Sequence, residues 1–168
     1  MGLWSDDYKN KLIEPDHLEE KVTEIRKSGH TIVTLNGSFD LMHAGHLHII
    51  YEASKLADVL IVALNSDASI QKYKSPDRPI IPLIYRLQMM AALSFVDYVT
   101  WFDETDPIRL LSVIKPDVHA NGAEYGENCI EAPIVKQNGG SIHIVKLVPG
   151  LSTSNILDKI VKLNSSGK

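Results

Sequence analysis

The residues best suited to chemistry lie at positions 36–46, in the sequence Asn-Gly-Ser-Phe-Asp-Leu-Met-His-Ala-Gly-His. Gly37 and Gly45 permit a close approach of the backbone to a ligand. His43 and His46 are three residues apart and fall on one side of a first helical turn. A turn that joins a strand to a helix presents backbone N–H groups and the positive helix end to an anion. The segment therefore predicts a phosphate-binding turn with two imidazoles beside the phosphate.

The residues alone leave two other interpretations of these histidines open. A histidine pair at a helix start is also compatible with capping or partial burial. A zinc site that includes Asp40 is a further alternative, but His48 is two residues from His46 and points off their common helical face. The remaining histidines have no evident partner in the sequence, and we interpret them as structural: His17, His30, His119 and His143.

Alternating strand and helix patterns must position this turn. After an amphipathic lead-in helix over 14–27, short apolar or β-branched runs predict strands at 30–35, 58–64, 97–101, 117–120 and 141–147. Helical patterns occur at 45–56, 83–93, 107–114, 128–137 and 152–163. Such alternation indicates a parallel sheet covered on both faces. We expect a lead-in over 1–29 and one doubly wound α/β domain over 30–168, with its ligand at the carboxyl ends of the strands, near the first strand and its neighbour.

Composition limits the partners. A chain of 168 residues with 44% hydrophobic and 23% charged residues matches one globular domain. The net charge of −4 gives no positive field that would gather nucleic acid. The N-terminus is acidic where a signal peptide is basic, and no apolar run approaches the roughly 20 residues of a membrane span. Because the single cysteine, Cys129, cannot form an internal disulfide, we expect a cytoplasmic protein with no membrane partner.

The stretch GSFDLMHAGH resembles the signature of the cytidylyltransferase-like superfamily of nucleotidyltransferases, which carries an H-x-G-H element in a Rossmann-like fold. Class I aminoacyl-tRNA synthetases share this element, but they need a longer chain and a second, lysine-rich signature. Further segments resemble, in the same order, the D-glycero-β-D-manno-heptose 1-phosphate adenylyltransferases, which make ADP-heptose for lipopolysaccharide: NSDASIQKYKSPDRPIIPLIYRLQMMAAL, VDYVTWFDETDPIRLLSVIKPDV, NGAEY and GGSIHIVKLVPGLSTSNIL. The resemblance implies transfer of an adenylyl group from ATP to a sugar phosphate, with release of pyrophosphate, on a Rossmann-like five-stranded sheet.

The resemblance also implies roles for individual residues. His43, His46 and Lys74 are the implied catalytic residues, with the imidazoles donating hydrogen bonds to the triphosphate. Lys74, Arg78 and Arg86 are implied contacts of the substrate phosphate. Mg²⁺ is the expected cofactor, and Asp40 is its expected ligand or a partner that orients a histidine. The implied nucleotide-binding residues are Gly37, Ser38, Phe39 (by its backbone), Asp40, His43, Gly45, His46, Asn121, Gly122, Glu124, Ser152, Thr153 and Ser154.

One segment departs from the resemblance. Residues 121–125 read NGAEY where the heptose phosphate enzymes carry lysine-glycine-glycine-aspartate-tyrosine, which leaves the base and the acceptor open. The alternatives are a glycerol-3-phosphate cytidylyltransferase that uses CTP, and a non-catalytic nucleotide-binding module. We expect a homodimer or a higher homo-oligomer. A separate chain that carries the pathway kinase is compatible with the resemblance.

Overall fold

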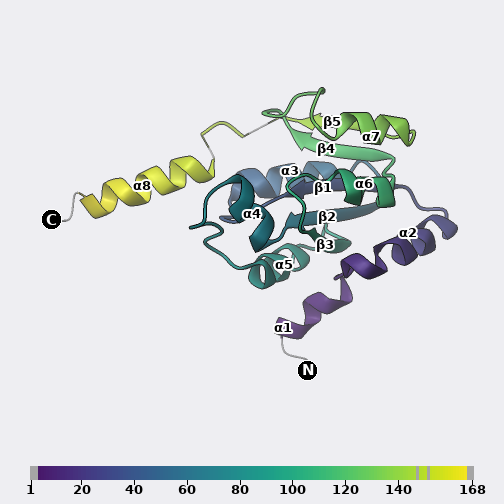
Figure 1. Cartoon of the computed structure of the whole chain (residues 1–168), viewed down its shortest axis with the longest axis horizontal. Coiled ribbons are helices and arrows are strands. Elements are labelled where there is room, and N and C mark those ends of the chain that lie inside the picture. The colour runs from purple at the N-terminus through teal and green to yellow at the C-terminus, as the bar shows by residue number, and fades with distance from the viewer. Residues whose placement is uncertain (1–3, 147, 151, 166–168) are drawn as a thin grey trace.

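A five-stranded parallel sheet forms the centre of the computed structural model, which describes residues 4–146, 148–150 and 152–165 (Figure 1). The strands are β1 (Ile32–Gly37), β2 (Val59–Asn65), β3 (Tyr98–Phe102), β4 (Val118–Gly122) and β5 (Ser141–Val145). Their order across the sheet is β3-β2-β1-β4-β5, and each neighbouring pair is parallel. The predicted α/β class with a doubly wound, Rossmann-like parallel sheet is confirmed.

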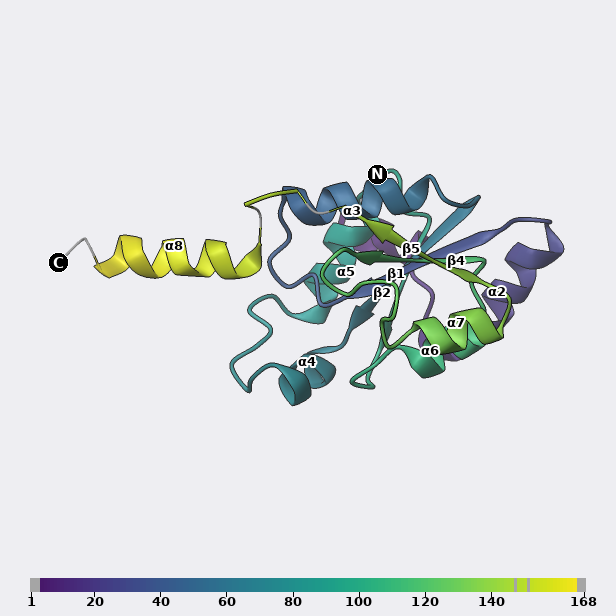
Figure 2. The ribbon, with the colours of Figure 1, turned by 90° about the horizontal axis from the view of Figure 1, so that it is seen from above.

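Helices cover both faces of the sheet (Figure 2). One face packs against α3 (Ala44–Ser54) and α5 (Leu83–Ala91), and the other against α2 (Leu18–Lys27), α6 (Ile108–Ile114) and α7 (Ala132–Gln137). The other described helices are α1 (Trp4–Asp7), α4 (Asp67–Tyr73), α8 (Thr153–Ser165) and the 3₁₀ turns η1 (Tyr8–Asn10) and η2 (Pro15–His17). None of the helices within the described ranges is long and apolar enough to cross a bilayer.

The apolar strand runs fill both layers of the core because successive strand residues point to opposite faces. Val33 and Leu35 pack toward α3 and α5, whereas Ile32 and Ile61 pack toward α2 and α6. Each such buried side chain stabilises the fold by about 1.5–3 kcal/mol relative to exposure. This two-sided burial explains why the strand sequences are continuously apolar rather than alternating.

The predicted elements occur with shifted boundaries. The first strand continues through Gly37, so residues 36 and 37 extend the sheet instead of beginning the turn. Helix α4 was not predicted, although Ser66 caps it in an ordinary way by accepting a hydrogen bond from the Ser69 N–H at 3.1 Å. Leu147, the predicted end of the last strand, lies outside the described residues, and the described strand ends at Val145.

The N-terminal segment lies along the outer edge of β3. The Ile13 N–H donates to the Val99 carbonyl at 2.8 Å, and the Val99 N–H donates to the Lys11 carbonyl at 2.9 Å. The Lys11 ammonium also donates to the carbonyls of Leu93 and Val96. The lead-in is thus attached to the domain and occupies backbone groups that an edge strand otherwise exposes.

The strand order places a switch point between β1 and β4. Six positions of β1 pair with β2, but the ladder between β1 and β4 contains only Val33 with Val118 and Thr34 with His119. The carboxyl-terminal halves of these two strands are therefore not joined to each other. In doubly wound sheets this is the place where a ligand enters, outside the carboxyl ends of the strands.

Candidate active site

The two histidines of the turn form the N-terminal cap of α3. His43 is the N-cap residue, and its Nδ1 accepts a hydrogen bond from the Gly45 N–H at 3.1 Å. Nδ1 of His46 accepts from the His43 N–H at 3.4 Å, and the two rings stack with centroids 3.9 Å apart. A ring nitrogen that accepts a hydrogen bond carries no proton, so each neutral imidazole holds its proton on Nε2. The cap therefore fixes both rings as Nε2–H donors.

Both histidines are held in the neutral form. Burial lowers the pKa of His43. Burial also lowers the pKa of His46 to about 4, with further contributions from the nearby charges of His43 and Lys74. At neutral pH, in the absence of ligand, the pair offers neutral hydrogen-bond donors rather than cations.

The zinc alternative for the histidines requires a cluster of ligands. No group of three or more His, Cys, Asp and Glu side chains among them is arranged to hold a metal ion. A zinc ligand would also need a free lone pair on the imidazole, whereas each Nδ1 is already engaged with the backbone. The zinc alternative for the histidines therefore finds no ligand set here.

Phe39 anchors the turn to the core. Its backbone adopts a left-handed conformation with φ of 46°, and its buried ring meets His46 edge-on with centroids 5.4 Å apart. A Cβ added to Gly37 would lie 3.1 Å from the Phe39 ring. Gly37 thus makes room for Phe39 as well as facing the cavity described below. The side chain of Phe39 therefore has a structural role, and a contact of its backbone with the nucleotide stays a prediction.

Asp40 fastens the loop after α4 to the turn. Its Oδ1 accepts from the N–H groups of Ile80 and Ile81, each at 2.8 Å, and its Oδ2 accepts from Nε of Arg78 at 2.6 Å. Burial by itself raises the pKa of Asp40, but the bonds from Ile81, Ile80 and Arg78 outweigh burial and hold the pKa below its ordinary value. Both oxygens are occupied by protein donors, so Asp40 does not fit the predicted role of Mg²⁺ ligand. Arg78 is likewise neutralised by Asp40, which weakens the expected phosphate contact.

Arg86 is enclosed rather than offered to a phosphate. Only 1% of the residue is exposed. Its guanidinium donates to the carbonyls of Ile81, Ser38 and Asn65 at 2.7–2.8 Å and to Oδ1 of Asp67 at 2.6 Å. The predicted substrate contact is corrected here: Arg86 ties the carboxyl ends of β1 and β2 to α4 and α5.

Lys74 lies at the edge of a cavity of about 240 Å³ at the carboxyl ends of β1, β2 and β4. Its Nζ donates to the Ser38 hydroxyl at 3.0 Å. Burial chiefly lowers the pKa of Lys74; the charges of Arg78 and Arg86 lower it further, and Asp40 opposes them. The described lining residues are Asn36, Gly37, Ser38, Asn65, Tyr73, Lys74, Phe102, Thr105, Asp106, Pro107, Asn121, Tyr125, Ile130 and Glu131.

The cavity brings together part of the predicted site. Gly37, Ser38, Lys74 and Asn121 were expected there from the resemblance. Asn36 and Asn65 were missed, although a polar side chain at the end of a buried apolar strand is a readable signal for a site at that sheet edge. Glu131 was also missed, and its sequence neighbours give no comparable signal.

Other predicted nucleotide contacts lie outside the cavity lining. The Glu124 side chain is exposed and folds against Gly122. Ser152 caps α8 by accepting a hydrogen bond from the Asn155 N–H at 3.1 Å, and α8 extends away from the sheet, as Figures 1 and 2 show. Thr153 and Ser154 leave with that helix, so the structure does not bring these three hydroxyl residues to the cavity.

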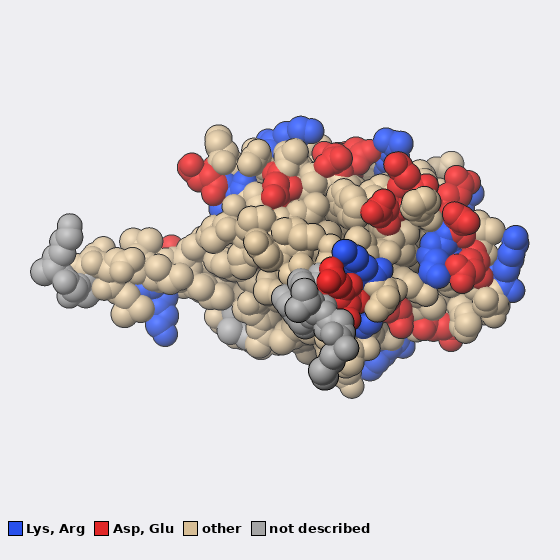
Figure 3. Space-filling model, turned by 90° about the horizontal axis from the view of Figure 1, so that it is seen from below, with Lys and Arg blue, Asp and Glu red and all other residues tan. Residues whose placement is uncertain are grey.

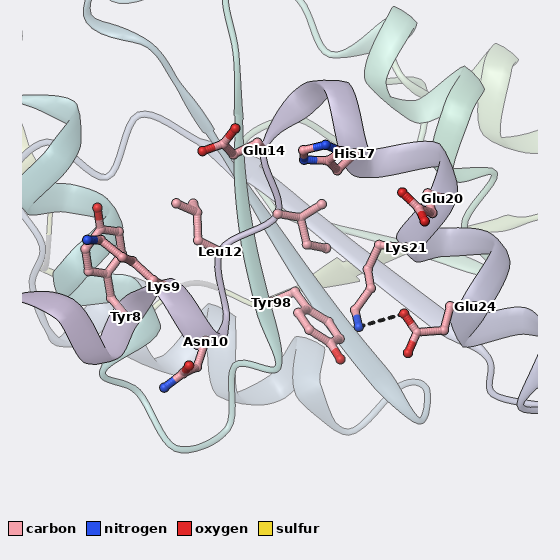
Figure 4. Close-up of a pocket in the computed structure, with 11 residues that line it drawn as sticks. Tyr8, Lys9, Asn10, Leu12, Glu14, His17, Glu20, Lys21, Glu24 and Tyr98 are labelled. Carbon is pink, nitrogen blue, oxygen red and sulfur yellow. Dashed lines mark hydrogen bonds and ion pairs between the residues drawn. The ribbon is translucent and has the colours of Figure 1, made fainter. Parts of the chain in front are cut away.

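A larger cavity, of about 600 Å³, lies at the opposite end of the strands (Figure 4). It is bounded by the N-terminal segment, α2 and Tyr98, the first residue of β3. Lys21 spans it, 2.9 Å from the Glu24 carboxylate and 5.0 Å from the Tyr98 ring centroid. This cavity lies at the other end of the strands from the histidine turn, and its Lys21 is already paired with Glu24. We therefore do not assign it to the candidate active site.

Charged side chains of both signs lie on the surface. Figure 3 shows acidic and basic side chains interspersed on one face of the described chain rather than gathered into a basic stripe. The net charge is −4. The face in Figure 3 therefore has no basic stripe of the kind that attracts a polyanion.

Comparisons with known proteins give a consistent picture. A family model described as cytidylyltransferase-like matches residues 34–156. Among curated proteins, the bifunctional protein HldE of Syntrophotalea carbinolica is 38% identical over 162 residues, covering 96% of this chain and 33% of that protein. HldE of Methylobacillus flagellatus is 41% identical over 152 residues, covering 90% and 31%. The chain spans about one third of the length of these relatives.

Solved structures resemble the same fold. The lipopolysaccharide core biosynthesis protein from Thermoplasma volcanium has a TM-score of 0.58 and 28% identity, covering 71% of this chain and 98% of that chain. The pantoate-beta-alanine ligase from Francisella tularensis has a TM-score of 0.56 and 17% identity, covering 90% and 79%, which is a likeness of fold alone.

Proposed function

Since the chain belongs to the cytidylyltransferase-like family of nucleotidyltransferases, we propose that it transfers an adenylyl group from ATP to a sugar phosphate. The acceptor we propose is D-glycero-β-D-manno-heptose 1-phosphate, and the products are an ADP-sugar and pyrophosphate. The relatives named HldE and the Thermoplasma volcanium protein named for lipopolysaccharide core biosynthesis support this choice.

In the proposed reaction a phosphate oxygen of the acceptor forms a bond to the α-phosphorus of ATP. The bond from the α-phosphorus to the oxygen that bridges to the β-phosphorus breaks, and its electron pair leaves with pyrophosphate. The acceptor oxygen is already ionised at neutral pH, so the protein need not remove a proton. Positioning and stabilisation of the developing charge must supply the rate.

The capped histidine pair is the observation that carries the proposal. Each Nδ1 is held by a backbone N–H, which leaves the Nε2–H as the donor for the triphosphate. A neutral donor fixed before the reaction stabilises charge as it moves to the leaving pyrophosphate. Lys74, held beside Ser38 at 3.0 Å, adds a positive charge at the edge of the adjacent cavity.

Mg²⁺ and a homo-oligomeric assembly stay as expectations of the resemblance. Asp40 is unsuited to hold the ion because its oxygens are bonded to Ile80, Ile81 and Arg78. Asp40 is therefore not the residue that we propose to hold the ion.

Asparagine and glutamine substitutions test the histidine pair. The side-chain oxygen of asparagine can accept at the place of Nδ1 and keep the cap, but asparagine lacks a donor at the place of Nε2. We expect His43→Asn and His46→Asn to lower kcat by about 10²–10³ while the fold is retained. Glutamine, whose amide N–H reaches nearer the Nε2 position, should retain more activity. His143→Asn, at an exposed histidine on β5, is the matched control.

The measurement is pyrophosphate release, with circular dichroism to verify folding. A folded His43→Asn and His46→Asn double variant with undiminished kcat would refute the proposed role of the pair. The substrate assignment is tested by a panel of ATP and CTP against heptose 1-phosphate and glycerol 3-phosphate. Turnover only with CTP would overturn the adenylyl assignment, and calorimetric ATP binding without turnover of any acceptor would favour a non-catalytic module.

A further inference from the structure

A row of polar side chains occupies the sheet face beneath α6 and α7. Ile32 packs on this face, so Thr34 and Asn36, two and four residues further along β1, point the same way. His119 and Asn121 of β4 lie on the same face, and His119 Nδ1 is 2.8 Å from the Thr34 hydroxyl. The row runs from the middle of the sheet to the cavity, where Asn36 and Asn121 line the wall.

Two atoms of this row lack hydrogen-bond partners within the described residues. These are Oδ1 of Asn36 and Nε2 of His119, and both are buried. A buried polar atom left unsatisfied costs about 1–3 kcal/mol, so native structures usually supply it with a partner. Asn36 is at the cavity, where a ligand can supply the donor that its Oδ1 needs.

Glu131 extends the row with a buried carboxylate. The residue is 5% exposed and lines the cavity, and its Oε2 accepts from Nδ2 of Asn121 across 3.4 Å. It takes part in none of the ion pairs found in the described part of the chain. A buried carboxylate is costly unless donors surround it. Oxygen atoms that require donors therefore dominate this side of the cavity.

The same cavity also has a cation on its lining. Lys74 is the one cationic side chain among the described residues that line it, and it lies beside the Ser38 hydroxyl. A matching ligand has an anionic group at the Lys74 end and several donor groups at the Glu131 end. Phosphate alone has no donors to spare at neutral pH. A nucleotide offers two ribose hydroxyls and one exocyclic amine spread over a ribose and a base, whereas a heptose 1-phosphate offers five hydroxyls on one small molecule that also carries its phosphate.

We propose that Glu131 and Asn121 are specificity-determining residues that receive hydroxyl groups of the acceptor. The inference rests on the proposed function, and it places the phosphate of the acceptor near Lys74 and its sugar ring against β4. The cavity volume of about 240 Å³ is smaller than that of ligand pockets for drug-sized molecules, roughly 300–1,000 Å³, and suits a single sugar ring.

The test is Glu131→Gln, which keeps the shape but replaces an acceptor oxygen by a donor. A hydrogen bond to a charged group contributes about 1.5–3 kcal/mol, so KM for heptose 1-phosphate should rise by about 10–100-fold. KM for ATP should change by no more than about twofold. Glu127→Gln, at an exposed glutamate of the same loop, is the matched control and should behave as the parent protein.

Deoxygenated acceptors provide a second measurement on the unmodified protein. Heptose 1-phosphate that lacks the hydroxyl received by Glu131 should lose affinity for the parent protein by the same factor, but should lose little further affinity for Glu131→Gln. If every deoxygenated acceptor in a complete series binds the parent protein undiminished, or if Glu131→Gln raises KM for ATP alone, the inference is wrong. A parent protein that transfers to no sugar phosphate overturns the proposed function as well, whereas an active parent with an unaffected Glu131→Gln overturns the inference alone.

Discussion

Replacing Arg86 by lysine separates a structural role from a phosphate-binding role. The guanidinium makes four hydrogen bonds, to the carbonyls of Ile81, Ser38 and Asn65 and to Asp67. A lysine ammonium has three donors at a single point and cannot span these acceptors. At least one buried carbonyl loses its donor, at a cost of about 1–3 kcal/mol each. We expect Arg86→Lys to lower the free energy of unfolding by about 2–4 kcal/mol.

Urea unfolding followed by circular dichroism measures this change, and pyrophosphate release measures KM for both substrates. Arg109→Lys is the control, because Arg109 is exposed and pairs with Glu104 at the surface, where such pairs contribute about 0–1 kcal/mol. If Arg86→Lys leaves the free energy of unfolding unchanged but raises KM for either substrate, the structural role of Arg86 is refuted. That result would restore the phosphate contact implied by the resemblance.

Three further changes test the surroundings of the site. Burial lowers the pKa of His119 from an ordinary 6.5 to about 4, and the charge of Glu131 opposes this shift. Between pH 6.5 and 4 the unfolded chain therefore binds a proton that the folded chain does not bind. The free energy of unfolding falls as the pH drops through this range. His119→Gln should remove up to about 3 kcal/mol of that decline in urea titrations across this range, and an unaltered decline would contradict the assignment. Asp40→Asn should cost about 3–5 kcal/mol by leaving Arg78 unpaired, and an unchanged urea midpoint would show that the ion pair is not needed. Gly37→Ala should cost about 1–3 kcal/mol because its Cβ meets the Phe39 ring at 3.1 Å, and an unaltered melting temperature would mean that the ring shifts freely.

The elements that repeat a simple pattern could be predicted from sequence. The apolar run at residues 58–64 predicts a strand without other information, and the spacing of His43 and His46 predicts the start of a helix. Side-chain partners from distant segments could not be predicted this way, because nothing local pairs Asp40 with Arg78. Arg86 did carry a signal: it lies three residues after Leu83 and four before Met90, on the face of α5 that packs into the core.

Whether a predicted helix or strand contributes residues to the site depends on how that element packs against the rest of the domain. The helix after Ser152 was expected from its period, but the period does not set the direction in which α8 leaves the sheet. The carboxylate of Glu131 is brought beside Asn121 only by the path of the chain between β4 and α7. Local patterns specify elements, while contacts between separate elements select the residues that face a ligand.

Because residues 11–13 bond to β3, the two edge strands of the sheet differ in how much of their backbone is free to pair with another strand. Along β3, the backbone of Val99 is already bonded to Lys11 and Ile13, whereas among the described residues β5 pairs with β4 alone and exposes polar residues such as Ser141 and His143. Because only the β5 border is open for pairing, two copies that associated strand to strand would form a closed pair and leave no open border for a third copy. A protease cut after Ile13 that releases the segment would open the second border, and copies could then add end to end without limit.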